Sequence, residues 1–248
     1  MNESSEMNKK ERKFKPSRVV MVVMLLVVIP LTLYFGRLIP GRSWYLLSGI
    51  VGVEILIPFI MSFEGRKPQA RELVTVAVMA AFAVIARIAI PLPSFKPTFA
   101  VIMLAGIALG PETGFIVGAV AAFGSDIFYG FGPFTPWQMM AYGCAGLLAG
   151  LVFGHKLLPK KNWVMGVFCF VCTLVIIGPI LDTSTVFTVA SKFTPEVVLP
   201  IYAAGIPVNI SHGICNFILL FFFGNAILEK LERVKLQYNL VETDEDGL

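Results

Sequence analysis

The chain has 248 residues, of which 56% are hydrophobic and 15% are charged, and its formal net charge is +4. Its mean hydropathy of +0.80 excludes an ordinary soluble domain, because such a domain needs a charged surface. Several apolar runs reach the ~20 residues that cross a bilayer as a helix. The alternating segments of about ten residues that are typical of a membrane β-barrel are absent. The sequence therefore predicts an all-α polytopic protein of the cell membrane.

The chain begins with a basic segment, residues 1–18, which is predicted to be a cytoplasmic tail. The apolar run that follows resembles the core of a secretory signal peptide. No small-x-small cleavage motif comes after it, and the stretch from Arg37 to Arg42 leads directly into another apolar run. We therefore predict two additional N-terminal transmembrane helices, over 19–35 and 44–63, within a segment 19–71.

A core of six helices is predicted over 72–230, which brings the total to about eight, and a charged tail over 231–248 ends the chain. Prolines punctuate this core: Pro91 ends its first helix and Pro111 interrupts the chain after its second. Thr135 suits the N-cap of the fourth core helix, and Pro136 suits its first position. The expected helices cover 72–90, 97–110, 114–128, 135–154, 163–181 and 199–228, with a polar link over 182–196.

The positions of the basic residues predict the orientation. With the N-terminus in the cytoplasm, the outer side receives five of the 20 Lys and Arg residues, namely Arg37, Arg42, Arg87, Lys96 and Lys192. The remaining 15 lie on the cytoplasmic side, as the positive-inside rule requires. Both termini are then cytoplasmic. The loops richest in proline, aromatic and polar residues (91–97, 129–136 and 182–196) face outward, so a site built from them would open to the outside.

Small residues recur at four-residue spacing on several predicted helices. Seven glycines fall into three groups, and the members of each group lie on one face of a helix, where they would let another helix pack closely. The groups are Gly106 and Gly110; Gly114 and Gly118; and Gly146, Gly150 and Gly154. Ala77 and Ala81 form a similar patch in the cytoplasmic half of the first core helix. Packing within the chain and docking of another membrane subunit are both open for this patch.

Polar residues at membrane depth are expensive and commonly line a cavity or pathway. Asp126, near the outer end of the third core helix, could bind a ligand, pair with Arg87 or Lys96, or face interfacial water. Arg87 could instead extend its side chain outward to the interface. Trp137 and Gln138 begin the fourth core helix, where an aromatic face beside an amide suits a planar, amide-bearing or heteroaromatic ligand. A tryptophan of the interfacial aromatic belt is the alternative.

Asn209, His212 and Asn216 follow one another at spacings of three and four, which places them on one face of the last helix. This polar stripe is expected to face the cavity or to pair with a neighbouring helix.

No catalytic or metal-binding pattern is present. The sequence lacks a GxxxxGKS/T motif, an HExxH motif and a GxSxG motif, so neither an ATPase nor another enzyme is predicted. Cys169 and Cys172 form a CxxC without a second ligand pair, and Cys144 and Cys215 also lie in apolar runs. We interpret all four as buried apolar residues and expect no metal and no cofactor.

The core over 72–230 resembles the S component, the substrate-binding membrane subunit, of energy-coupling factor (ECF) vitamin transporters. The resemblance rests on the order of several short motifs and on the topology. These motifs are Ala77-x-x-x-Ala81, Ala86-Arg87 leading to Pro91-x-Pro93, Phe95-Lys96-Pro97, the glycine-rich run 109–126 and the outer loop 130–139.

The resemblance implies a fold of six helices with an outward-facing pocket that captures a vitamin and does not hydrolyse ATP. It also implies a separate coupling module, made of a membrane scaffold and two ATPases, with Ala77 and Ala81 contacting the scaffold. The two N-terminal helices depart from the family pattern, and their role is open. The segment around Trp137 and Gln138 looks like S components for cobalamin. Riboflavin, pantothenate, folate and queuosine precursors are the alternative substrates.

The candidate substrate-binding residues come from the loops 91–97 and 129–136, from the helix ends next to these loops and from the last helix. They are Arg87, Phe95, Lys96, Asp126, Tyr129, Trp137, Gln138, Asn209, His212 and Asn216. Two hypotheses of other classes compete with transport. One is a membrane enzyme that uses Asp126 or His212 on a lipid-soluble substrate, and the other is an assembly protein whose glycine faces bind other helices.

Overall fold

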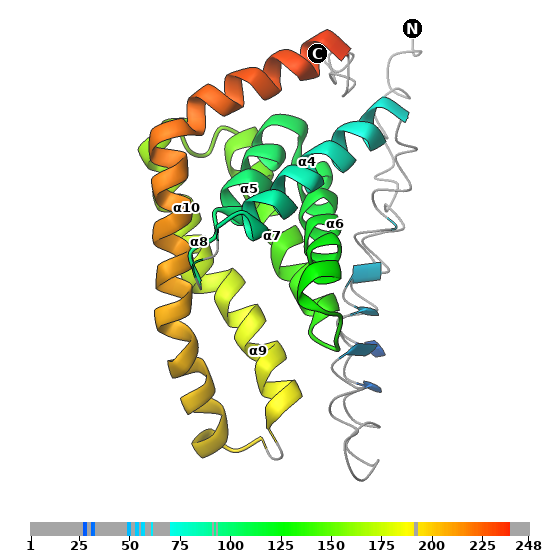
Figure 1. Cartoon of the computed structure of the whole chain (residues 1–248), viewed down its shortest axis with the longest axis vertical. Coiled ribbons are helices and arrows are strands. Elements are labelled where there is room, and N and C mark those ends of the chain that lie inside the picture. The colour runs from blue at the N-terminus through cyan, green and yellow to red at the C-terminus, as the bar shows by residue number, and fades with distance from the viewer. Residues whose placement is uncertain are drawn as a thin grey trace, which may run out of the picture.

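The computed structural model describes residues 27–28, 31–32, 49–50, 53–54, 56–57, 61, 70–90, 92, 94–190 and 193–238. Within these residues the protein is helical and contains no strand (Figure 1). The elements of the core are α4 (Ala70–Ile88), α5 (Thr98–Leu109), α6 (Pro111–Tyr129), α7 (Thr135–Gly154), α8 (Asn162–Cys172), η2 (Thr173–Ile177), α9 (Gly178–Val189) and α10 (Pro195–Tyr238). Most of the predicted N-terminal pair, the N-terminal tail and residues 239–248 lie outside the described residues, so the total of eight spans stays a prediction. The last helix extends beyond its predicted end near 228, because α10 continues to Tyr238 in the predicted C-terminal tail.

Three of the described helical stretches are long and apolar enough to cross a membrane: Thr135–Gly154, Asn162–Val189 and Pro195–Gln237. The expected all-α class of an integral membrane protein is thereby supported. The bounds of α7 coincide with the predicted ones. By contrast, α6 begins at Pro111, which the sequence analysis took as an interruption. A proline fits the first turn of a helix, where its missing N–H costs no hydrogen bond.

The predicted polar link over 182–196 is wrong, because α9 continues as helix to Val189. The threonine hydroxyl groups of this segment find their hydrogen-bond partners within the helix itself. Thr183, Thr185 and Thr188 donate hydrogen bonds to the carbonyl oxygens four residues earlier, at 2.7, 3.2 and 2.8 Å. Such back-bonding satisfies a hydroxyl inside a transmembrane helix. Between α8 and α9, the π-helical turn η2 precedes Pro179 and keeps the span continuous.

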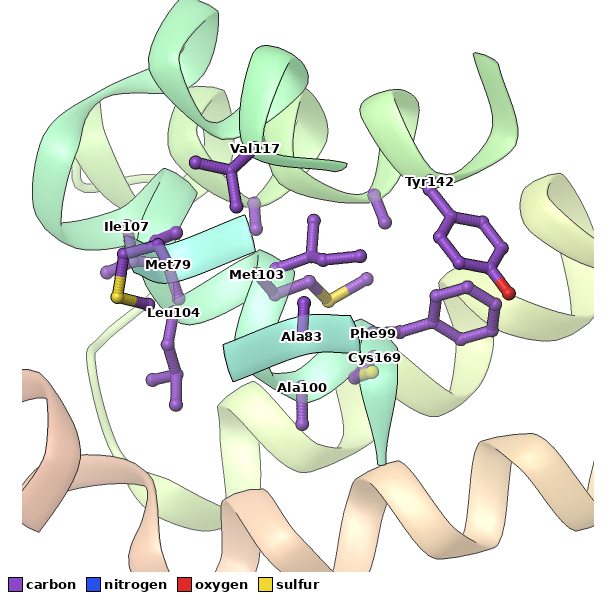
Figure 2. Packing of buried hydrophobic residues seen from close by; sticks show 14 of the residues in the cluster. Met79, Ala83, Phe99, Ala100, Met103, Leu104, Ile107, Val117, Tyr142 and Cys169 are labelled. Carbon is purple, nitrogen blue, oxygen red and sulfur yellow. The ribbon is translucent and has the colours of Figure 1, made fainter. Parts of the chain in front are cut away.

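The short helix α5 is the centre of the core. Eleven of its twelve residues are buried, and α4, α6, α7, α8 and α10 all pack against it. Figure 2 shows Phe99, Met103 and Ile107 of α5 among side chains from α4, α6, α7 and α8. A helix that is apolar on all sides belongs inside a protein, and α5 fits this rule.

Glycines bring α5, α6 and α7 into backbone contact. A Cβ atom at Gly106 would lie 2.0 Å from the carbonyl oxygen of Gly146, and one at Gly146 would lie 2.2 Å from that of Gly114. Gly118 and Gly150 make similar approaches, whereas the positions of Gly110 and Gly154 are open. The predicted close packing is therefore present at five of the seven glycines. Gly110 has another role, since its φ of 105° makes the turn between α5 and α6.

Part of the additional N-terminal segment contacts the core. Leu56 is 4% exposed and packs with Phe115 and Ala119 of α6. Earlier in the same segment, Thr32 donates a hydrogen bond of 2.6 Å to Glu54, which gives one oxygen of this carboxylate a partner. The predicted second N-terminal helix thus contributes at least one side chain to the packing around α6.

Candidate functional site

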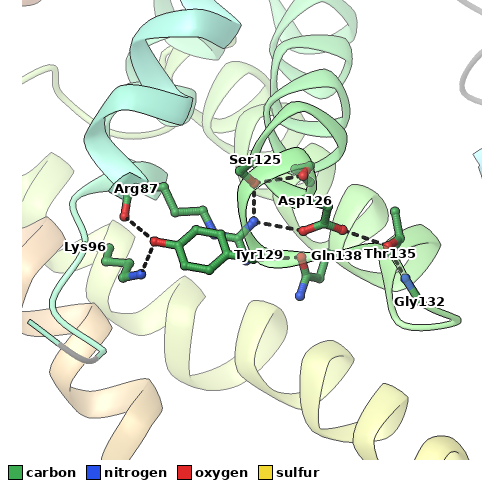
Figure 3. Close-up of polar contacts among 9 residues, drawn as sticks. Arg87, Lys96, Ser125, Asp126, Tyr129, Gly132, Thr135 and Gln138 are labelled. Carbon is green, nitrogen blue, oxygen red and sulfur yellow. Dashed lines mark hydrogen bonds and ion pairs between the residues drawn. The ribbon is translucent and has the colours of Figure 1, made fainter. Parts of the chain in front are cut away.

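Arg87, in the last turn of α4, is the centre of a polar network near the predicted outer side (Figure 3). Its Nη1 donates to Ser125 Oγ and lies 3.4 Å from Asp126 Oδ1. Its Nη2 donates to Gln138 Oε1 at 3.2 Å. One guanidinium group therefore joins α4 to both α6 and α7, and the planar fork of an arginine suits such a multiple contact.

Asp126 is fully buried, and its charge is compensated within the protein. Arg87 lies against Oδ1, and Thr135 Oγ1 donates to Oδ2 at 2.7 Å. Of the three interpretations offered by the sequence, the structure therefore favours pairing with Arg87. Such a buried pair is costly to disrupt, since the partner left behind would be an uncompensated charge.

Thr135 does not act as the N-cap that the sequence analysis predicted, since the cap position belongs to Phe134. Its hydroxyl is used elsewhere: it donates to Asp126 and accepts from the backbone N–H of Gly132 at 3.1 Å. The side chain thereby ties the loop between α6 and α7 to the buried carboxylate.

Lys96 and Tyr129 extend the network toward the connection between α4 and α5. Lys96 Nζ donates to Tyr129 Oη at 2.5 Å, and Tyr129 Oη donates to the carbonyl oxygen of Arg87 at 3.2 Å. The guanidinium carbon of Arg87 also lies 4.9 Å from the centre of the Tyr129 ring and 5.3 Å from that of Tyr142. At these distances the rings attract the cation.

A cavity of about 310 Å³ lies beside this network, between α7 and α9. Three hydroxyl side chains and one amide give it polar character, and the remaining walls are apolar. Its lining residues are Phe134, Gln138, Leu181, Ser184, Thr185, Thr188 and Val189. Gln138 belongs to both features, because it accepts the hydrogen bond from Arg87 and also lines the cavity.

The structure brings together five of the ten predicted binding residues: Arg87, Lys96, Asp126, Tyr129 and Gln138. The wall of the cavity that α9 contributes was not predicted from the sequence, because this segment was interpreted as a polar link. One signal was available, since Ser184 and Thr188 are four residues apart and share a helix face. Whether any of these residues binds a ligand stays a prediction.

Trp137 lies inside the protein, where it is 7% exposed. Its indole ring stacks on Phe187 of α9, with ring centres 5.6 Å apart and an interplanar angle of 23°. Phe193 lies against Phe187 in turn, at 5.2 Å. This aromatic contact joins the N-terminal turn of α7 to the C-terminal part of α9 next to the cavity, whereas a belt residue would face the interface.

The three polar residues of α10 have separate environments. Asn209 Nδ2 donates to Asp182 Oδ2 of α9 at 3.0 Å. The ring of His212 lies 5.9 Å from that of Phe99, and its buried Nδ1 has no hydrogen-bond partner among the described residues.

Phe95 lies half-buried between α4 and α5, apart from the cavity lining.

Asn216 is fully buried and holds the N-terminus of α5. Its Oδ1 accepts from the backbone N–H of Ala100 at 2.7 Å, and its Nδ2 donates to the carbonyl oxygens of Lys96 and His212 at 3.1 and 2.7 Å. The amide therefore caps the central helix and fixes the backbone of Lys96.

Substitution of Asn216 by Leu is expected to lower the free energy of unfolding by about 2 kcal/mol or more, since it leaves a buried N–H and a buried carbonyl oxygen unpaired. Thermal unfolding in detergent measures the effect. The variant Ile214→Ala, at a position of α10 that is 43% exposed, is the control. Equal stability of both variants would show that the cap is not required.

Ala77 and Ala81 are exposed on α4. The same face carries exposed apolar side chains, namely Leu73, Val74, Val78, Phe82 and Ile85. The opposite face packs into the core through residues that include Val76, Met79 and Ala83. The two alanines therefore do not serve packing against the described part of the chain.

These features define a helical integral membrane protein with a ligand-sized cavity near one side, whose mainly apolar walls carry three hydroxyl groups and one amide. The family model of the S component of ECF-type riboflavin transporters matches residues 67–229. A UPF0397 protein of Aliivibrio salmonicida (strain LFI1238) is 32% identical over 75 residues, which cover 30% of this chain and 39% of that protein. The chain thus aligns with well under two thirds of this relative's length. No solved structure matches.

The chain therefore belongs to the family of ECF-transporter S components. It is a transporter subunit and not an enzyme, which removes the hypothesis of a membrane enzyme.

Proposed function

We propose that this subunit captures a vitamin at its outer side and delivers it inward together with a scaffold and two ATPases. Both termini are cytoplasmic in this proposal, in agreement with the distribution of basic residues. The observation that carries the proposal is the cavity between α7 and α9, next to the buried network around Arg87 and Asp126. The exposed small-residue face at Ala77 and Ala81 supports α4 as the surface that docks on the scaffold.

We favour a flavin over a corrinoid as the substrate. The family match is to a riboflavin-type S component, and the cavity of about 310 Å³ is at the lower end of the ~300–1,000 Å³ usual for ligand pockets. A corrinoid, with its macrocycle and many side-chain amides, needs far more room. The earlier preference for cobalamin relied on the aromatic and amide character of Trp137 and Gln138, but Trp137 packs against Phe187.

The polarity of the lining supports an uncharged ligand. Among the residues that line the cavity none is basic, and the guanidinium of Arg87 is already occupied by Asp126, Ser125 and Gln138. Pantothenate and folate carry carboxylates, which would lack a counter-charge here.

Hydrogen-bonding roles in the cavity are also defined. Gln138 Oε1 accepts from Arg87, so its NH₂ group can donate to a ligand, while Thr185 and Thr188 donate to the helix and can accept. A neutral ring system with carbonyl acceptors and N–H or O–H donors, such as a flavin, meets these requirements.

Titration of the purified protein with riboflavin, followed by quenching of flavin fluorescence, tests the proposal. We expect saturable binding at micromolar concentration or below. Thr188→Val should weaken it about two- to tenfold, the cost of one hydrogen bond. The control is Thr183→Val, whose hydroxyl contacts Tyr202 of α10 instead of the cavity. Binding of cobalamin alone would overturn the substrate assignment, and failure to bind any vitamin would overturn the function.

A further inference from the structure

The helix α4 carries two features along its length. The exposed small-residue face at Ala77 and Ala81 lies near its middle, and its last turn carries Arg87. The sequence between them contains neither glycine nor proline, and the helix is unbroken from Ala70 to Ile88. Sharp kinks in helices almost always occur at proline, at glycine or at π-bulges. A shift of the small-residue face is therefore transmitted along α4 to Arg87.

Arg87 is the side chain through which this helix reaches the cavity wall. Its Nη1 is held by Ser125 and Asp126 of α6, while its Nη2 donates to Gln138 Oε1 of α7. Only 12% of the Arg87 side chain is exposed, which limits competition from water. Gln138 also lines the cavity, and its NH₂ group is the end of the amide that the contact with Arg87 leaves available. The path from cavity to docking helix thus consists of two side chains.

We propose that Arg87 is a positioning residue that couples occupancy of the cavity to the position of α4, through Gln138. The inference rests on the proposed function, because it assumes that a ligand enters the cavity and that α4 docks on the scaffold. A ligand acceptor that binds the NH₂ group of Gln138 polarises the amide, and this strengthens the hydrogen bond that Oε1 accepts from Arg87. Occupancy therefore favours the position of α4 in which Arg87 and Gln138 are bonded.

Linkage gives this proposal a measurable form. If ligand changes the affinity of the subunit for the coupling module, the module must change the affinity for ligand by the same factor. The ratio of the riboflavin dissociation constants of the free and the assembled subunit is that factor. Typical coupling between sites amounts to roughly 5–150-fold, so we expect a ratio that differs from one by about fivefold or more.

The test measures this ratio in lipid nanodiscs, for the subunit alone and for the nucleotide-free complex with its native scaffold and ATPases. Arg87→Lys keeps a positive charge beside Asp126 but loses the fork that also reaches Gln138. We expect the free variant to bind riboflavin within about threefold of wild type, while its ratio falls to about one. Tyr142→Phe is the matched control, because it keeps the ring that contacts the guanidinium, and it should retain the wild-type ratio.

Each other outcome is decisive. A wild-type ratio of one, or an unchanged ratio in Arg87→Lys, would overturn the coupling. Loss of riboflavin binding by a folded Arg87→Lys subunit would show that the guanidinium contacts the ligand directly, which also overturns it. Absence of binding by wild type, alone and assembled, would refute the proposed function itself and the coupling with it.

A second measurement covers the case in which Arg87→Lys does not fold. Riboflavin should slow amide hydrogen exchange in the last turn of α4, over 85–89, in the wild-type subunit and in Tyr142→Phe alike. Unchanged exchange in this turn at saturating riboflavin would contradict the proposal.

Discussion

Gly146→Leu is expected to be among the most destabilising single substitutions in the core that leave every charge in place. A Cβ atom at this position would lie 2.2 Å from the carbonyl oxygen of Gly114 and 2.9 Å from its Cα. The obstacle is backbone on another helix, so no change of rotamer relieves it and α6 and α7 must separate. Overpacking of a core costs about 1–3 kcal/mol and occasionally more, and we expect a cost at the upper end. The loss of stability appears as a lower midpoint of thermal unfolding in detergent.

Gly154→Leu is the matched control for this experiment. Gly154 lies on the same helix, two four-residue steps further along, yet nothing lies within 4 Å of a Cβ atom there. The same change in side chain should therefore leave the midpoint nearly unchanged. If both variants lost the same stability, the cause would be the loss of glycine from α7 in general, and the close approach to Gly114 would not matter.

Ala77→Trp is expected to abolish transport while leaving vitamin binding intact. The residue is exposed on α4, ten residues before Arg87, so an indole group there meets no described part of the core. It would, however, hold a docking partner away from a face whose small residues permit close approach. Uptake of labelled riboflavin into proteoliposomes that contain the whole transporter should fall at least tenfold. The riboflavin dissociation constant of the free subunit should stay within about twofold of wild type, which is a smaller change than the loss of one hydrogen bond would cause.

Val175→Trp provides the comparison. Val175 is 66% exposed on the π-helical turn η2, so it receives the same bulk away from α4, and transport should persist. If Ala77→Trp lost binding as well as uptake, the separation of the docking face from the binding site would be wrong.

The sequence was most informative where a physical requirement left few solutions. A carboxylate that is buried needs a partner, and pairing of Asp126 with Arg87 was one of three interpretations that the sequence left open; the structure shows this pair. Thr135 to Gly154 was recognisable as a helix from its proline at the start and its apolar length. The central position of α5 was not predicted. Its apolar residues indicate that the helix is buried, but they do not indicate which helices surround it.

The errors came from polar residues whose partners are not visible in the sequence. The threonines of α9 suggested a loop, although their hydroxyls bond to the helix itself. Asn209 and Asn216 share a face, as predicted, yet one contacts α9 and the other caps α5. Equal spacing likewise grouped Gly154 with Gly146, and only the path of the neighbouring helices distinguishes them.

The brevity of α5 has a consequence for how the protein is made. Its twelve residues extend roughly 18 Å at 1.5 Å per residue, well short of the ~30 Å of a hydrocarbon core. A segment of this length is a poor substrate for insertion by itself during synthesis. Gly110 turns the chain directly into α6, and a Cβ atom at Gly114 would already lie 2.5 Å from Gly106. We therefore expect α5 and α6 to enter the membrane together, as a preformed helical hairpin.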